Sequence, residues 1–294
     1  MADKKQSHGD TDDSAKTEAE QSGVDTVDGP CYYVPKVDQY RYSMDYPCAG
    51  VCVIINNINF HPYLNMNTLN GCDYDASHVR ETFENMGYKV YMFRDVTTAQ
   101  MKQALQRASM EDHSNCASFV CVILSHGEKD VVFGTDGRVP LETLTQYFKG
   151  HKCRSLLGKP KLFFINACRG NNSDAGVDMV DGGDSVDGVE NYITYRIPLE
   201  ADFLYAYSTS PGFVAWMMPR GSFFIHEVCQ MIENHKDLEL MQIMTRVNGI
   251  VAHRDMFCDE GKRYMESYKQ MPSVTSMLTK EFYFPNRFKR FALH

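Results

Sequence analysis

The sequence lacks several features that define large classes of protein. No apolar run approaches the roughly 18 residues of a membrane span, and the residues after Met1 are polar and charged, without the apolar core of a signal peptide. No Cys-x-x-Cys pair indicates a zinc site. We therefore expect a cytoplasmic protein with no membrane contact, no metal and no other cofactor. Its ten cysteines should be free thiols rather than disulfides.

Neither sign of charge dominates the part of the chain that is expected to fold. The net charge of -8 is concentrated in residues 1–30, with eight acidic and three basic side chains, and in residues 171–191, with six acidic and none basic. A basic stripe would predict nucleic-acid binding and an acidic one a cation partner. We expect no nucleic-acid partner. Residues 1–30 should be disordered, and residues 171–191 should form a mobile loop, because neither segment can bury a core.

Apolar runs alternate with helical patterns along the rest of the chain. Buried strands are expected at 51–55, 118–124 and 161–167, and further strands at 88–93, 201–207 and 280–284, the last as a sheet edge. Helices are expected at 73–86 with Asp73 as N-cap, 98–110, 140–148, 221–235 and 238–253. This alternation predicts an α/β fold with a mostly parallel sheet covered on both faces.

A histidine and a cysteine each follow the end of a buried strand, which is where active sites lie in such sheets. A Cys168 thiolate could attack a peptide carbonyl while His126 protonates the leaving amine. The backbone N–H groups of Gly127 and Cys168 could bind the oxyanion. Alternatively, His126 is a hydrogen-bonded loop residue and Cys168 an inert buried thiol. Because both occur at strand ends in matching motifs, we favour the nucleophilic interpretation.

From about Tyr40 to Phe284 the chain resembles the executioner caspase family of cysteine peptidases. The matching segments are Ser125–Glu128, Gly158–Phe164, Ala167–Gly170, Glu200–Leu204, Ala206–Thr209 and Ser276–Glu281. The resemblance implies a three-layer α/β/α sandwich around a six-stranded, mostly parallel sheet. It also implies a disordered pro-segment (1–30) and a single domain (31–294), made of a large-subunit part (31–170), an inter-subunit linker (171–191) and a small-subunit part (192–294).

The resemblance also assigns roles to individual residues. His126 and Cys168 match the catalytic dyad, and Gly127 matches the oxyanion donor. Asp28, Asp181 and Asp187 resemble processing sites that another caspase would cut. The alternative is that acidic, low-complexity segments contain such tetrapeptides by chance.

The pocket for the substrate aspartate departs from the family. Two arginines and a glutamine hold this carboxylate in the family, and here those positions are Leu69, Met217 and Asn166. Arg220, three residues beyond Met217, is the only nearby cation in this loop that could replace them. Other substrate-contacting positions carry Val214, Ala215 and Phe223 in place of an aromatic residue, a serine and a tryptophan, whereas Trp216 is retained.

Loss of the clamp predicts weak cleavage after aspartate. Arginine suits a carboxylate because its planar fork bonds both oxygens. A buried carboxylate without its partner loses about 3–5 kcal/mol, which is a factor of ~10²–10⁴ in turnover. Neutral drift of a working enzyme is the other explanation, but it would not change every clamp position while the dyad is retained.

Two functions remain open. The first is a weakly active or inactive regulator (decoy) in apoptosis, which forms a homodimer or a heterodimer with a paralogous caspase, occupies an inhibitor-of-apoptosis protein, or competes for protein substrates. The alternative is an active cysteine endopeptidase with an apolar P1 preference. Retention of His126 and Cys168 favours the alternative, whereas the changes at Val214 and Ala215 favour the regulator, which we prefer.

Overall fold

The computed structural model describes residues 40–173, 198–258 and 266–285. All of these lie in one compact unit, Lys36–His294. The expectations for the segment 1–30, for most of the loop 171–191, and for Asp28, Asp181 and Asp187 fall outside the described residues.

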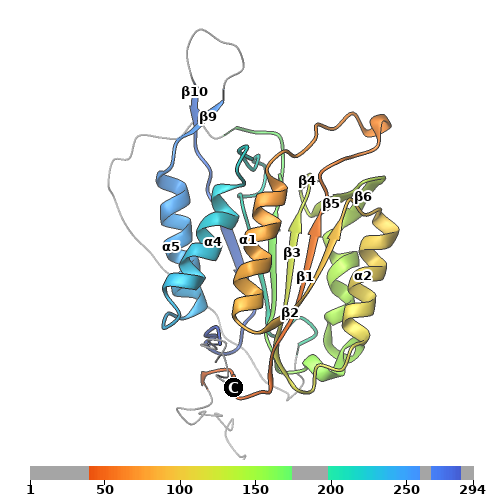
Figure 1. The fold of residues 1–294 in the computed structure, drawn as a ribbon, viewed down its shortest axis with the longest axis vertical. Helices are drawn as coiled ribbons and strands as arrows, with labels where there is room; N and C mark the ends of the chain where they lie inside the picture. The colour runs from red at the N-terminus through yellow and green to blue at the C-terminus, as the bar shows by residue number, and fades with distance from the viewer. Residues whose placement is uncertain (1–39, 174–197, 259–265, 286–294) are drawn as a thin grey trace, which may run out of the picture. The chain divides into compact units, whose positions relative to one another are not determined.

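A six-stranded sheet forms the centre of this unit, in the order β11-β8-β7-β3-β1-β2 (Figure 1). All neighbouring pairs are parallel except β11, which runs antiparallel to β8. The strands are β1 (Cys48–Asn56), β2 (Tyr88–Arg94), β3 (Cys116–Leu124), β7 (Lys161–Asn166), β8 (Phe203–Tyr207) and β11 (Ser273–Ser276). The predicted six-stranded, mostly parallel sheet is thereby confirmed.

Helices cover both faces of the sheet (Figure 1). One face packs against α1 (Cys72–Asn85), α4 (Phe223–Asn234) and α5 (Leu240–His253), and the other against α2 (Thr98–Met110) and α3 (Leu141–Thr145). Successive residues of a strand point to opposite faces. Cys52 and Ile54 accordingly join the first core, whereas Val53 and Ile55 join the second. The α/β/α sandwich is built from this alternation.

The remaining elements are short. A three-stranded antiparallel sheet consists of β4 (Gly127–Glu128), β5 (Val131–Gly134) and β6 (Gly137–Pro140), and a two-stranded one of β9 (Met256–Cys258) and β10 (Glu266–Tyr268). The 3-10 turns are η2 (Pro62–Leu64), η3 (Gln146–Phe148), η4 (Gly150–Lys152) and η5 (Arg154–Leu156). Within the described ranges, no helix is long and apolar enough to cross a membrane.

The predicted N-cap at Asp73 is wrong. Helix α1 begins at Cys72, and its N-cap is Gly71, with φ 105°. Asp73 lies in the first turn instead, where it accepts a hydrogen bond from Asn56 Nδ2. An acidic side chain is favourable at either position, because both lie at the positive end of the helix dipole. The sequence pattern alone therefore could not fix the first helical residue.

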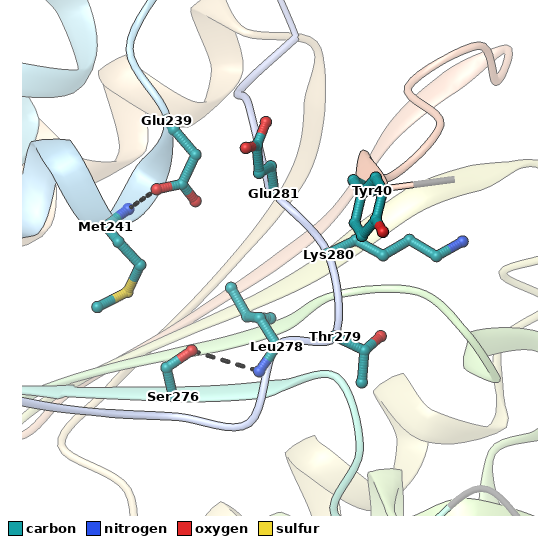
Figure 2. A pocket seen from close by; sticks show the side chains of 8 residues that line it. All are labelled: Tyr40, Glu239, Met241, Ser276, Leu278, Thr279, Lys280 and Glu281. Carbon is teal, nitrogen blue, oxygen red and sulfur yellow. Dashed lines mark hydrogen bonds between the residues drawn. The ribbon is translucent and has the colours of Figure 1, made fainter. Parts of the chain in front are cut away.

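The predicted edge strand at 280–284 is also wrong, because the edge strand is β11. Phe282 and Phe284 are both buried in the core beside α1, α4 and α5, which explains the alternating pattern that predicted a strand. This segment does not pair with β8. Glu281 forms only an isolated bridge with Arg41. The chain from Ser276 to Glu281 runs beside Tyr40 (Figure 2). These residues help to line a hollow of about 370 Å³.

Candidate active site

Cys168 and His126 both lie just beyond the carboxyl ends of neighbouring parallel strands. Leu124 at the end of β3 is paired with Asn166 at the end of β7. The Ser125 N–H donates to the Asn166 carbonyl at 3.3 Å, which continues the register beyond the strands. His126 and Cys168 each follow within two residues of these strand ends. The two strands therefore deliver both chemical groups to one place.

Gly127 lies directly against the backbone of the nucleophile. A β-carbon at Gly127 would lie 2.6 Å from the Cys168 carbonyl oxygen and 2.8 Å from Cβ of Ala167. No other residue fits at these distances without a shift of the backbone. The close approach brings together the two backbone segments that are expected to supply the oxyanion donors.

The imidazole of His126 is oriented by the loop that follows β1. Its Nε2 lies 2.8 Å from the carbonyl oxygen of Asn67. Its ring also packs against Phe60, with 4.8 Å between the ring centroids. A carbonyl can only accept, so Nε2 carries a proton in this contact and Nδ1 is left as an acceptor. The ring is thus prepared to take a proton through Nδ1.

The thiol of Cys168 is held by the substrate loop and not by His126. The N–H of Ala215 donates to Sγ at 3.3 Å, and Sγ lies 3.8 Å from the Ala215 carbonyl oxygen. No hydrogen bond joins the thiol to His126 among the described residues. Burial raises the pKa of the Cys168 thiol, which the Ala215 hydrogen bond opposes only in part. The resting thiol is therefore protonated, and a thiol is a poor nucleophile until it ionises.

Backbone hydrogen bonds hold the start of the substrate loop beside the nucleophile. The Arg169 N–H donates to the Phe213 carbonyl at 2.9 Å, and the Gly212 N–H donates to the Arg169 carbonyl at 2.9 Å. The Val214 N–H donates to the carbonyl of Asn172 at 3.0 Å. Val214 and Ala215 are consequently positioned by backbone contacts that do not depend on their side chains.

Two of the three clamp positions carry apolar side chains that pack against the same hydrophobic core cluster. Leu69 and Met217 are half-buried and pack, with Trp216 and Phe223, against the core beside α1 and α4. Sδ of Met217 lies 3.4 Å from the position a β-carbon would take at Gly71, close to Leu69 in the chain. This cluster has no charge to offer a substrate carboxylate.

The third clamp position, Asn166, carries an unsatisfied polar atom. Its side chain is 3% exposed, and its Oδ1 has no hydrogen-bond partner among the described residues. Asn166 is one methylene shorter than the family's glutamine, and its amide carries no charge to pair with a carboxylate. Arg220 is exposed at the tip of the turn closed by Met218 and Gly221. The described residues contain no ion pair to Arg220.

Two residues that the sequence did not single out support this loop. Gln270 accepts from the Trp216 N–H at 2.8 Å and donates to the Ser208 carbonyl at 2.7 Å. Both oxygens of Asp75 accept from the Ser222 N–H at 3.0 Å. Burial raises the pKa of Asp75 to about 7, against the lowering effect of the Ser222 hydrogen bonds. Neither residue stands in a recognisable motif, so no sequence signal identifies them.

No cluster of three or more histidine, cysteine, aspartate or glutamate side chains that could hold a metal occurs in the described parts of the chain. The chemistry available is that of a thiol, an imidazole and backbone donors. Acyl transfer through Cys168 fits these groups.

Comparison with known proteins gives a consistent result. A family model described as a caspase domain matches residues 49–283. The chain is 46% identical to caspase-7 of Gallus gallus over 249 residues, which cover 83% of this chain and 80% of that protein. It is 49% identical to caspase-3 of Mesocricetus auratus over 247 residues, with 83% and 86% covered. It is 47% identical to caspase-3 of Bos taurus over 246 residues, with 83% and 87% covered.

Proposed function

The chain belongs to the caspase family as an executioner-caspase-like cysteine protease homologue, and from this premise we propose that it has lost efficient cleavage after aspartate and regulates a catalytic caspase. The observation that carries the proposal is that the two clamp positions expected to hold arginines carry the apolar, half-buried Leu69 and Met217, which pack against the core. A substrate aspartate would enter this region without any positive charge.

Loss of the charged clamp has a large energetic cost for an aspartyl substrate, which can be compared with the catalytic contributions that remain. A buried carboxylate without a partner costs about 3–5 kcal/mol, or ~10²–10⁴ in kcat/KM. The retained oxyanion donor at Gly127 contributes ~10²–10³ by comparison. Loss of the clamp therefore costs an aspartyl substrate at least as much as the loss of one oxyanion donor would, although the oxyanion site itself is unaffected.

The resting state of the nucleophile supports the same proposal. Cys168 is buried, its pKa is raised, and its hydrogen bonds go to the backbone of Ala215 rather than to His126. Catalytic hydrogen bonds are often long in a free enzyme and shorten when substrate binds. Here binding of an aspartyl substrate lacks the contacts that would drive this rearrangement.

The regulatory role requires a partner, and the sheet edge supports one. Strand β11 pairs with β8 on one side, and within the described residues no strand pairs with its other side. An open edge can pair with a second chain. We propose a homodimer or a heterodimer with a paralogous caspase through this edge. Inhibitor-of-apoptosis proteins and protein substrates are the other partners for which the chain would compete.

The processing sites fit this proposal. Asp28, Asp181 and Asp187 would be cut by a catalytic caspase, because this chain would not recognise aspartate itself. Expressed alone at high concentration, the chain should stay in one piece. Spontaneous cleavage that Cys168→Ala abolishes would contradict the proposal.

A labelling experiment tests the proposed function. The purified protein is incubated with a peptide aldehyde bearing aspartate at P1 and then with iodoacetamide, and alkylation of Cys168 is followed by mass spectrometry. We expect slow alkylation, rising at alkaline pH, that the aldehyde does not prevent. Protection of Cys168 at concentrations that protect an executioner caspase would overturn the proposal.

The alternative function is an active endopeptidase with an apolar P1 preference. The contact between Gly127 and the Cys168 backbone favours it, because this contact retains the oxyanion site. The matched experiment uses an aldehyde that differs only in having leucine at P1. Protection by the leucyl aldehyde and not by the aspartyl one would favour this alternative over the regulator.

A further inference from the structure

Two cysteines outside the active site lie opposite each other in the sheet. Cys48 is the first residue of β1, Cys116 is the first residue of β3, and the register of this parallel pair aligns them directly. Directly paired residues of neighbouring strands project to the same face of a sheet. His126 follows the carboxyl end of β3, and Cys168 follows the carboxyl end of the neighbouring parallel strand β7, so the cysteine pair lies at the opposite ends of the strands from Cys168.

The spacing of such a pair suits a covalent bond. Neighbouring strands lie about 4.7–4.9 Å apart, and disulfides join Cα atoms about 4.4–6.8 Å apart. Both residues are free thiols. The spacing of neighbouring strands therefore lies within the range of Cα separations that a disulfide spans.

The two thiols already interact and differ in accessibility. Cys48 is half-buried, with its Sγ 3.5 Å from the Gly50 carbonyl, whereas Cys116 is 7% exposed. The pKa of Cys116 is raised to about 12 by its burial first, and then by a hydrogen bond with Cys48. An oxidant would thus reach Cys48 first, and the neighbouring Cys116 thiol would be protonated at that stage.

A buried ammonium group lies next to this pair. Nζ of Lys159 donates to the carbonyls of His113 and Ser114 at 2.7 and 2.9 Å, just before Cys116 in the chain. Its charge acts on Cys116 in the direction that favours the thiolate. The second thiol therefore has a nearby cation that stabilises it when it ionises to attack.

We propose that Cys48 and Cys116 form a redox-active pair that hydroperoxides convert into a disulfide joining the first residues of β1 and β3. The sulfur of Cys48 attacks the peroxide oxygen, which breaks the O–O bond and gives a sulfenic acid and, from hydrogen peroxide, water. The Cys116 sulfur then attacks the Cys48 sulfur and displaces its hydroxyl group as a second water. Two thiols and one hydrogen peroxide thus yield one disulfide and two waters. Thiol reductants reverse the change.

Two other cysteines in the same strands provide an internal comparison. Cys52 of β1 is paired with Val120, and Cys121 of β3 is paired with Val53, so these two cysteines are out of register. Both are fully buried, and they belong to the cores on opposite faces of the sheet. They have neither the alignment nor the access that Cys48 and Cys116 share.

Peptide mapping of the full chain tests the proposal. A Cys168→Ala background removes the nucleophile as a competing thiol. The protein is treated with hydrogen peroxide, blocked with N-ethylmaleimide, digested and analysed for a peptide pair that is lighter by two hydrogens. We expect the Cys48–Cys116 pair, and we expect it to persist in the matched control Cys153→Ser. A bond between Cys116 and Cys153, or between two chains, would overturn the proposal.

Single variants separate the two steps. Cys116→Ser should accumulate a sulfenic acid at Cys48 that dimedone traps, whereas Cys48→Ser should leave Cys116 reduced. If Cys116→Ser fails to fold, Cys48→Ser still decides, because oxidation of Cys116 in that variant would contradict the order of the steps. Persistent sulfenic acid at Cys48 without the cross-link in the parent would also overturn the proposal.

Thermal unfolding gives an independent readout. The disulfide would close a loop of about 70 residues, so oxidation should raise Tm by about 5 °C or more. Reductant should return Tm to its first value, and Cys48→Ser should show no shift. An unchanged or lower Tm in cross-linked protein would contradict a bond formed without strain.

Discussion

The backbone that surrounds the nucleophile and the pocket that should receive the substrate aspartate differ in how closely they follow the caspase pattern. Around Cys168, the β3 and β7 ends, the Gly127 contact and the orientation of His126 are all present. At the clamp positions, Leu69 and Met217 are apolar and pack against the core, and Asn166 is buried with an unpaired oxygen.

This difference shows that bond formation and substrate selection depend on separate parts of the fold. The nucleophile and its oxyanion donor are positioned by strand register, which the whole sheet determines. Two of the three clamp positions, Leu69 and Met217, come from the turn before α1 and the loop before α4, where a side chain can change without disturbing the sheet, whereas Asn166 ends β7. On the proposed function, the specificity pocket has changed while the nucleophile keeps its position in the sheet.

Restoring the family's clamp residues would remove the difference between the pocket and the backbone around Cys168. Of the changes considered, it should have the largest effect on activity. Leu69→Arg, Asn166→Gln and Met217→Arg together should raise cleavage of an Asp-Glu-Val-Asp reporter by ~10² or more, because the carboxylate regains its charged partners. The single changes should be strongly non-additive, since three groups share one carboxylate. Reporter kinetics measure the gain.

The clamp experiment needs two controls. Melting curves must match, because a lone arginine in an apolar cluster destabilises the fold, and Cys168→Ala in the triple variant must abolish the gain. If the stable triple variant stays inert, the changes at Val214 and Ala215 have disabled substrate alignment as well. The pocket alone would then not explain the loss.

Gly127→Ala should destabilise the backbone that surrounds Cys168. The added β-carbon meets the Cys168 carbonyl, so the free energy of unfolding should fall by about 1–3 kcal/mol. Gly249→Ala is the matched control. Gly249 is exposed within α5 and its β-carbon would meet nothing within 4 Å, so that variant should gain about 0.5–1 kcal/mol. Urea unfolding compares the two, and equal effects would show that the close approach to Cys168 is not important.

Asp75 should make the pocket side sensitive to pH. Below about pH 4 the group is protonated in the folded and the unfolded chain. As pH rises towards the folded pKa of about 7, the unfolded chain ionises first, so stability is lost. Between pH 5 and pH 8, the free energy of unfolding of Asp75→Asn should therefore rise by about 1–2 kcal/mol relative to that of the parent.

Urea unfolding at several pH values measures the Asp75 effect. Asp73→Asn serves as the control for removing a carboxylate from the same helical turn, where the side chain is exposed. Parallel pH curves for the parent and Asp75→Asn would rule out a buried, protonated Asp75.

The smallest effect is expected at Arg220. Because this side chain is exposed at the tip of a turn, Arg220→Ala should change residual reporter hydrolysis by less than about twofold, within the range of ordinary surface substitutions. A tenfold loss would mean that Arg220 moves into the pocket and supplies the missing charge, which would remove the contrast between the two regions.

The sequence predicted the sheet better than the loops, for physical reasons. Strands β1, β3 and β7 are buried on both faces and therefore appear as continuous apolar runs. Strand β11 is short and half-exposed, whereas the apolar pair Phe282 and Phe284 belongs to the core without pairing in the sheet. Hydrophobicity reports burial, and it does not report which backbone groups pair.

The candidate site could likewise be predicted where strand ends define it, but not where loops do. Strand ends and local motifs identified His126, Gly127 and Cys168, because sheet register brings them together. The contact of Cys168 with Ala215 spans 47 positions of the chain, and the Asp75 contact with Ser222 spans 147. Such contacts depend on how loops fold back on the sheet, which no local pattern encodes.

The central claim, that the clamp is lost while the nucleophile is retained, is tested most directly by turnover of two reporters that differ only in aspartate or asparagine at P1. A charged clamp separates these isosteres strongly, whereas an uncharged pocket does not. We predict that the parent hydrolyses the aspartyl reporter at least ~10²-fold more slowly than an executioner caspase, with no preference for it over the asparaginyl reporter. Aspartyl turnover at the executioner rate, selective over asparagine and abolished by Cys168→Ala, would contradict the account.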